Sequence, residues 1–156
     1  MTDGDCDALM REAIDQARRA AALGDVPIGA VVARDGRIVA AAHNRRIIDA
    51  DPTAHAEMLA IRAAAKTLGD WRLERCTLAV TLEPCCMCAG AIVLARIPLL
   101  IYGAADPKAG AVRTLYQLCE DARLNHRVEV IAGVQAQECG SLLTDFFRAQ
   151  RAMGKK

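Results

Sequence analysis

Two short apolar segments limit the folds that are open to this chain. CTLAVTL, residues 76–82, and PLLIYGA, residues 98–104, are continuous apolar runs rather than alternating ones. Runs of this kind and length are typical of strands that are covered on both faces. Residues 86–95, between them, are predicted to form a helix. We therefore predict a sheet with helices packed on its faces.

The amino-terminal third of the sequence predicts a β-hairpin. Apolar runs at residues 27–34 and 37–43 flank the dipeptide Asp35-Gly36. Asp-Gly favours a tight hairpin turn, because both central residues of such a turn need a positive φ. We therefore expect two antiparallel strands joined at this dipeptide.

Helical spacing of apolar side chains and turn residues predict the other elements. A first helix is expected over residues 7–23, before Gly24, and a second begins near Pro52 and Thr53 and ends at Gly69. Further helices are expected at residues 111–119 and 135–151, with a short strand in VEVIAG, residues 128–133. The order predicts an α/β fold with a central mixed five-stranded sheet, in a single domain over residues 1–156.

Composition excludes some classes of protein and leaves others open. The 156 residues are 53% apolar and 25% charged, as in a globular domain with a sizeable core. No apolar run approaches the roughly 18 residues of a membrane span, so we expect a soluble, cytoplasmic protein that makes no membrane contact. The seven cysteines are an odd number, and in that compartment they are not expected to form disulfides. A net charge of +1 does not by itself attract a polyanion.

Two motifs place metal ligands at predicted helix starts. His55-Ala56-Glu57 opens the second helix, with His55 expected in its first turn, and PCCMC, residues 84–88, opens the third. Residues three apart on a helix share a face, so Cys85 and Cys88 can point at one atom, whereas Cys86 is rotated away. We predict Cys86 to be a packing residue.

A CxxC pair has several interpretations. It can be a redox dithiol, although no thioredoxin-like pattern surrounds it here, half of a closed structural zinc site, or two packed thiols. The closed site needs a fourth ligand, for which Cys86, Cys76 and His43 are candidates. Alternatively, His55 joins Cys85 and Cys88 in a three-ligand set, which leaves one tetrahedral position for water and is the mark of a catalytic site.

Glu57 has two possible roles beside such a site. It lies about 200° around a regular helix from His55, so the two residues would not ordinarily bind one ion. A carboxylate that does not bind the metal but lies beside metal-bound water can act as general base and then as general acid. Had HAE stood alone, a solvated carboxylate favoured by the helix dipole would be the default interpretation.

HAE followed by PCxxC resembles the signature of the zinc-dependent nucleoside and nucleobase deaminases. Matching segments along nearly the whole chain, among them DVPIGAVV, DPTAHAEMLAIR, TLEPCCMCAGAIVLARI and ECGSLLTDFFR, are similar to the bacterial tRNA-specific adenosine deaminases. The resemblance implies a cytidine-deaminase-like three-layer sandwich, a homodimer, and one Zn²⁺ per subunit held by His55, Cys85 and Cys88. It also implies hydrolysis of adenosine to inosine at the wobble position of a tRNA anticodon, in an arginine tRNA.

The resemblance assigns further roles around the metal. A zinc-activated water would attack C6 of adenine while Glu57 transfers protons and ammonia leaves. Asn44 would hydrogen-bond the flipped base, and the backbone of Ala56 would line the same pocket. Asp106 and Lys108 stand in the loop that approaches the neighbouring nucleotide of the anticodon stem-loop. For these two residues, a simple proline-containing turn is the alternative.

The carboxyl-terminal segment FFRAQRAMGKK combines aromatic and basic side chains. Adjacent aromatics can stack on bases and cations can contact phosphates, although the same helical spacing also predicts core residues with a solvated basic face. The resemblance favours Phe147 and Arg148 as RNA contacts and Phe146 as a packed residue.

Three positions lack an arginine that relatives usually carry: Ala105, Leu99 and Gln150. Fewer cations should weaken RNA affinity and flatten its salt dependence, without affecting deamination itself. A zinc-dependent deaminase of free nucleobases or nucleosides, such as guanine or cytosine, is therefore the alternative enzyme. A zinc-stabilised RNA-binding module, closed by a fourth cysteine, is the alternative that is not an enzyme.

Overall fold

A computed structural model describes residues 1–155 and contains one five-stranded sheet. The strands are β1 (Gly29–Arg34), β2 (Arg37–His43), β3 (Cys76–Leu82), β4 (Leu99–Ala104) and β5 (Glu129–Ile131), in the order β2-β1-β3-β4-β5. β1 pairs antiparallel with β2 and β3, whereas β3, β4 and β5 run parallel. The predicted mixed five-stranded sheet is thus confirmed.

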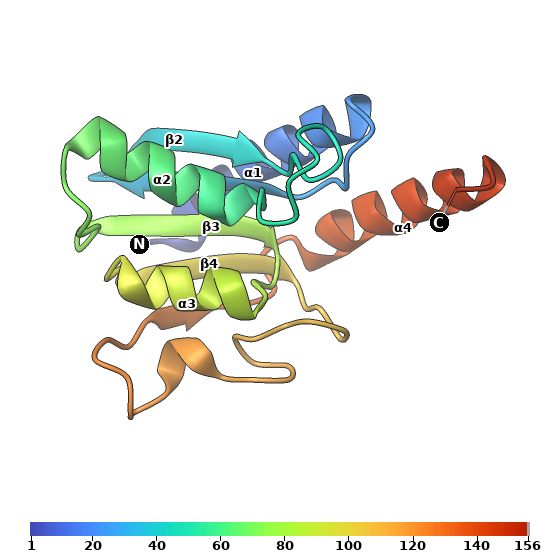
Figure 1. The fold of residues 1–156 in the computed structure, drawn as a ribbon. Coiled ribbons are helices and arrows are strands. Elements are labelled where there is room, and N and C mark those ends of the chain that lie inside the picture. The colour runs from blue at the N-terminus through green and yellow to red at the C-terminus, as the bar shows by residue number, and fades with distance from the viewer. Residues whose placement is uncertain (156) are drawn as a thin grey trace.

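Helices cover both faces of this sheet (Figure 1). They are α1 (Asp3–Ala22), α2 (Ala56–Leu68), α3 (Cys86–Leu94) and α4 (Ala136–Ala152). One hydrophobic cluster joins α2 and α3 to the sheet through residues such as Ala60, Ile92 and Leu100. A second joins α1 and α4 to the opposite face through Met10, Ile101 and Cys139. The three-layer arrangement follows from strands that are apolar on both faces. Within residues 1–155, no helix is both long and apolar enough to cross a membrane.

The first helix begins four residues earlier than the apolar spacing predicts. Thr2 is its N-cap: the Thr2 hydroxyl accepts a hydrogen bond from the Asp5 backbone, and the Asp5 carboxylate accepts one from the Thr2 backbone. This capping box satisfies two backbone donors at the helix start, so a polar segment without apolar periodicity is helical.

The hairpin forms at the expected dipeptide. Asp35 and Gly36 both have positive φ, 50° and 76°, between β1 and β2. Gly29, at the start of β1, lies so close to α1 that a Cβ there would collide with the backbone of Ala13 and Ala17. α1 therefore packs directly against the start of β1.

The prediction of a helix over residues 111–119 is wrong. This segment consists of turns and ends in a short 3-10 helix, η1 (Leu118–Glu120). Three of its backbone N–H groups, from Val112, Arg113 and Thr114, donate to the carboxylate of Glu83 instead of to carbonyls of a preceding helical turn. An acceptor 29 to 31 residues away in sequence thus replaces the local hydrogen bonds that a helix needs.

Candidate metal centre and pocket

Three side chains converge where α2 and α3 begin. The ligand atoms of His55, Cys85 and Cys88 all lie within 4.8 Å of one another. His55 Nδ1 lies 3.6 Å from Cys85 Sγ and 3.5 Å from Cys88 Sγ. Tetrahedral Zn²⁺ with bonds of about 2.3 Å to sulfur and about 2.0 Å to nitrogen needs nitrogen and sulfur about 3.5 Å apart. The donor set and its spacing therefore fit zinc.

Two helix N-caps supply two of these ligands. His55 is the N-cap of α2 and Cys85 that of α3, and both have extended backbone angles. His55 thus lies just before the first turn, not inside it as the sequence predicts. Neither side chain caps its own helix, so both are free to point outward at the ion. The unpaired N–H groups of the two helix starts favour negative charge on the sulfur atoms.

Close contacts among the three side chains shift their pKa values. The pKa of Cys85 falls to about 3, first because Cys88 donates a hydrogen bond to it and also because of the neighbouring His55. The same contact with Cys85, together with burial, raises the pKa of Cys88. His55 has a raised pKa, chiefly through its contact with Cys85. Cys85 is therefore the thiolate of the cluster, and a divalent cation would displace the protons of Cys88 and His55 as it binds.

The residues expected to close a structural site do not belong to this cluster. Among residues 1–155, His55, Cys85 and Cys88 form the group with metal-ligand spacing, without Cys86, Cys76 or His43. Cys86 is exposed, so the prediction that it is a packing residue is wrong. Cys76 is buried at the start of β3, and the His43 ring lies 2.9 Å from the backbone oxygen of Asn44. The cluster offers three candidate metal ligands, and two of them, His55 and Cys85, also line a pocket.

Glu57 lines the same pocket and is almost wholly buried. Its side chain is only 4% exposed, and this burial raises the pKa of the Glu57 carboxyl. A buried carboxyl group with a raised pKa can take up and release a proton near neutral pH. The solvated alternative for Glu57 does not fit its burial.

Asn44 presents a hydrogen-bond donor to the pocket. The side-chain amide oxygen of Asn44 (Oδ1) accepts a hydrogen bond of 2.9 Å from the backbone N–H of Ala56, which fixes the orientation of the side-chain amide. The amide nitrogen is buried without a protein partner. Ala56 itself is buried and does not line the pocket, so its backbone acts through Asn44. A buried donor of this kind is satisfied by a polar ligand.

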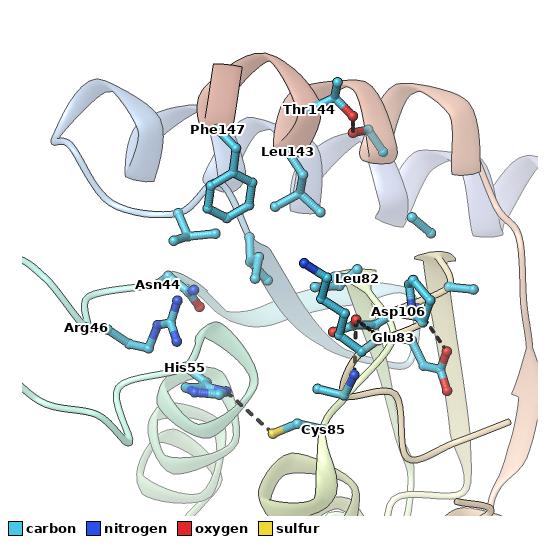
Figure 2. Close-up of a pocket in the computed structure, with 18 of the residues that line it drawn as sticks. Asn44, Arg46, His55, Leu82, Glu83, Cys85, Asp106, Leu143, Thr144 and Phe147 are labelled. Atoms are coloured by element: carbon cyan, nitrogen blue, oxygen red, sulfur yellow. Dashed lines mark hydrogen bonds between the residues drawn. The ribbon is translucent and has the colours of Figure 1, made fainter. Parts of the chain in front are cut away.

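The pocket has a volume of about 630 Å³, within the range of small-ligand sites. One face of α4 forms its roof, with Leu143 and Phe147 pointing toward Asn44 and His55 (Figure 2). Phe147 is 42% exposed, while Phe146 is more buried and stands edge-on to it. Arg148 does not line the pocket, and its guanidinium lies 3.8 Å from the carboxylate of Asp145.

Buried Glu83 fixes the wall of the pocket opposite α2. Its carboxylate accepts hydrogen bonds from the backbone of Asp106 and of residues 112–114, and from the Thr114 hydroxyl. Burial alone would raise the pKa of Glu83, but these hydrogen bonds outweigh it and hold the pKa below its usual value. Gly110 packs so tightly here that a Cβ would lie 2.5 Å from the carboxylate.

The predicted RNA-contacting loop is part of this wall. Asp106 and Lys108 both line the pocket. The Asp106 carboxylate accepts backbone hydrogen bonds from Lys108 and Ala109, so it shapes the turn as well. The turn expected as the alternative is present, and its position at the pocket leaves contact with a neighbouring nucleotide as a prediction.

A second buried carboxylate fixes the other side of the pocket. Asp25 is fully buried and accepts hydrogen bonds from the backbone of Val26, Ile47 and Ile48. It thereby holds the segment after β2, which carries Arg46 into the pocket.

Several pocket residues have no role in the sequence prediction. They are Arg46, Glu83, Leu143 and Thr144. The last two share the helical spacing of Phe147, which could have found them, whereas buried Glu83 leaves no such pattern. Arg151, one of the cations expected to contact phosphate, also lines the pocket. Of the positions that lack arginine, Ala105 lines the pocket, whereas Leu99 packs against the core beneath α1 and α4. Gln150 lies on α4 and does not line the pocket.

Comparisons with known proteins agree with this geometry. Residues 4–151 match the MafB19-like deaminase family. A tRNA-specific adenosine deaminase of Bacillus subtilis is 52% identical over 146 residues, which cover 94% of this chain and 91% of the relative. The chain is therefore similar to a deaminase throughout its length, not only at the metal motifs.

Two solved structures share the fold at substantial identity. One, from a study of A-to-I editing by tRNA:A34 deaminases at the wobble position, is 44% identical with a TM-score of 0.84, covering 87% of this chain and 99% of its own. The other is a guanine deaminase from Bacillus subtilis, 41% identical with a TM-score of 0.61, covering 63% of each chain. The expected cytidine-deaminase-like fold is confirmed by the first of these.

Proposed function

This chain belongs to the MafB19-like deaminase family, and we propose that it is a tRNA-specific adenosine deaminase. In this proposal it hydrolyses adenosine to inosine at the wobble position of a tRNA anticodon, in an arginine tRNA. The observation that carries the proposal is the cluster of three candidate metal ligands beside a pocket. Two members of the cluster, His55 and Cys85, line this pocket together with buried Glu57. The chain acts as one domain over residues 1–156.

His55, Cys85 and Cys88 would hold one zinc ion per subunit. When bound, zinc supplies a Lewis acid that activates water for attack on C6 of adenine. The cluster's two sulfur ligands and its distances of 3.5 and 3.6 Å support zinc over magnesium or calcium, which prefer oxygen ligands.

Glu57 moves the protons of this reaction. It accepts a proton from the attacking water and delivers protons to the substrate. Of the two water hydrogens, one ends on ring N1 and the other on the exocyclic nitrogen, which leaves as ammonia. The raised pKa of Glu57, which follows from its burial, suits both transfers.

Other pocket residues hold the nucleotide. The Asn44 amide donates to an acceptor on the base, and its hydrogen bond from Ala56 keeps the donor aimed at the pocket. Phe147 offers an exposed ring for stacking on an unpaired base. Lys108 and Arg151 supply positive charge at the pocket.

We propose a cytoplasmic homodimer whose interface includes the outer side of α3. Leu94 on α3 is 69% exposed, and Leu115 and Tyr116 in the neighbouring turns are 53% and 56% exposed. Large apolar side chains with this exposure support burial against a second copy of the chain.

Incubation of the zinc-loaded protein with an anticodon stem-loop tests the function. Inosine should form at the wobble adenosine, with one ammonia released per inosine, and Glu57→Ala should abolish the product while retaining zinc. An active Glu57→Ala protein, or a parent protein that binds no zinc, would refute the proposal.

Deamination of a free base such as guanine is the second candidate function. The structural similarity to a guanine deaminase favours it, as does the loss of an arginine at Ala105 in the pocket wall. Direct competition between the stem-loop and free guanine or cytosine separates the two functions, because each predicts which substrate is consumed first.

A further inference from the structure

Two adjacent arginines after β2 have different surroundings. Arg45 forms a two-pronged contact with Asp49, with hydrogen bonds of 2.8 and 3.0 Å. Arg46 takes part in no ion pair among residues 1–155. Its Nε atom is buried and has no hydrogen-bond acceptor in the part of the chain that the structure describes. Of the two neighbouring charges, only that of Arg45 is therefore neutralised by these residues.

Arg46 lies at the pocket rather than on the open surface. It lines the pocket together with Asn44, across from Phe147 on α4 (Figure 2). The backbone that follows it is held by Asp25, which accepts hydrogen bonds of 2.8 and 3.1 Å from Ile47 and Ile48. The guanidinium is thus attached to a fixed segment and faces a space that a ligand can enter.

A partly buried guanidinium with an unsatisfied Nε–H is stabilised by a ligand that brings an acceptor and negative charge. The planar fork of arginine matches phosphate oxygens, to which it can donate two parallel hydrogen bonds. Lys108 and Arg151 also line the pocket. Of the carboxylates that line it, those of Glu83 and Asp106 accept hydrogen bonds from their own wall of the pocket.

We infer that Arg46 is a substrate-binding residue that contacts a phosphate attached to the nucleoside in the pocket. This inference rests on the proposed function, in which the phosphate is a phosphodiester of the RNA. The 5′-phosphate of a free mononucleotide offers the same chemistry. Arg46 therefore separates substrates that carry a phosphate from free nucleosides and bases.

Binding measurements test the inference independently of turnover. In the inactive Glu57→Gln background, the affinity for a labelled stem-loop is measured by fluorescence anisotropy from about 50 to 200 mM salt. Arg46→Met should weaken binding at least about tenfold and lower the slope of log affinity against log salt by about 0.7, the loss of one single-strand phosphate contact. Arg46→Lys, which retains the charge, should retain the slope.

Arg11→Met is the matched control, because Arg11 is exposed on α1 and does not line the pocket. It should leave affinity and slope unchanged. Melting temperatures of all variants, measured alongside, identify any variant that is misfolded. An Arg46→Met protein that is folded, binds the stem-loop within twofold of the parent and keeps its salt slope would overturn the inference.

Kinetics with three substrates identify the source of the phosphate. In the active protein, which keeps Glu57, Arg46→Met should raise KM for the stem-loop and leave KM for adenosine unchanged. If the parent deaminates adenosine 5′-monophosphate but not the stem-loop, and only the monophosphate KM rises in the variant, the phosphate contact stands and the proposed tRNA function fails. An equal rise in KM for adenosine would overturn the phosphate contact, since Arg46 would then act on the nucleoside.

Discussion

The buried carboxylate of Glu83 gives a stability prediction whose size follows from its hydrogen bonds. In Glu83→Gln, the best orientation of the amide keeps the oxygen toward the N–H groups of residues 112–114, at the position of Oε2. The amide NH₂ then faces the Asp106 N–H, which donates to Oε1 in the parent and loses its acceptor. The Thr114 hydroxyl can rotate to accept from the amide.

The magnitude combines one lost acceptor with a weakening of the remaining bonds. A part-buried N–H without an acceptor costs about 1 kcal/mol. The three hydrogen bonds from the N–H groups of residues 112–114 change from charge-assisted to neutral, which in a buried site costs about 1 kcal/mol for each bond. Because Arg113 and Thr114 are exposed, the three together should cost about 2 kcal/mol. The variant should therefore lose about 3 kcal/mol, which is a fall of about 6–12 °C in Tm for a chain of this size.

The difference in stability between the parent and Glu83→Gln should shrink as the pH falls. The pKa of Glu83 is lower in the folded protein than in the unfolded chain, where it is about 4.3. Its contribution is therefore fully present well above pH of about 4.3 and is lost as the pH falls through the folded pKa. Parent and Glu83→Gln should differ most near neutral pH and converge in acid.

Thermal unfolding followed by circular dichroism measures this, with a chelator present throughout so that loss of metal in acid does not contribute. Glu129→Gln is the matched control, because Glu129 is exposed on β5 and accepts no side-chain hydrogen bond among residues 1–155. A Glu83→Gln protein within about 2 °C of the parent at neutral pH would refute the reasoning, as would a difference that persists unchanged in acid.

Three further substitutions separate the roles of pocket and metal residues. Glu57→Gln should lower kcat by about 10²–10⁴ with zinc content unchanged, measured by inosine formation and metal analysis; loss of zinc would show that Glu57 is needed for the site to form. Cys86→Ser should leave two sulfur atoms around the metal in X-ray absorption spectra, because Cys86 is exposed outside the cluster, whereas loss of one sulfur would favour a closed structural site. Phe147→Ala should weaken stem-loop binding about 5- to 150-fold through lost stacking, in a titration where an unchanged affinity would exclude Phe147 from the interface.

Sequence patterns predict those parts of the fold that depend on local spacing. The hairpin at Asp35-Gly36 and the buried strands β3 and β4 are confirmed because turn chemistry and continuous apolar runs are local signals. The segment over residues 111–119 is mispredicted because its hydrogen bonds go to Glu83, which is distant in sequence. The capping box at Thr2 likewise extends α1 into a segment without apolar periodicity.

The metal cluster follows from local sequence patterns, whereas the position of Arg46 depends on a residue that is distant in sequence. His55, Cys85 and Cys88 come together as their helix starts predict, since the ends of strands and the starts of helices meet at one edge of the sheet. Arg46 depends on Asp25, which fixes its loop and lies far from it in sequence, and no spacing in the sequence reveals that contact.

Sequencing of tRNA after reaction shows whether the protein deaminates a wobble adenosine. Total tRNA is incubated with the zinc-loaded protein or with Glu57→Ala, and inosine is read as guanosine after reverse transcription. We expect a change at the wobble adenosine of an arginine tRNA with the parent and none with the variant. Unchanged tRNA, together with ammonia release from a free base such as guanine, would contradict this expectation.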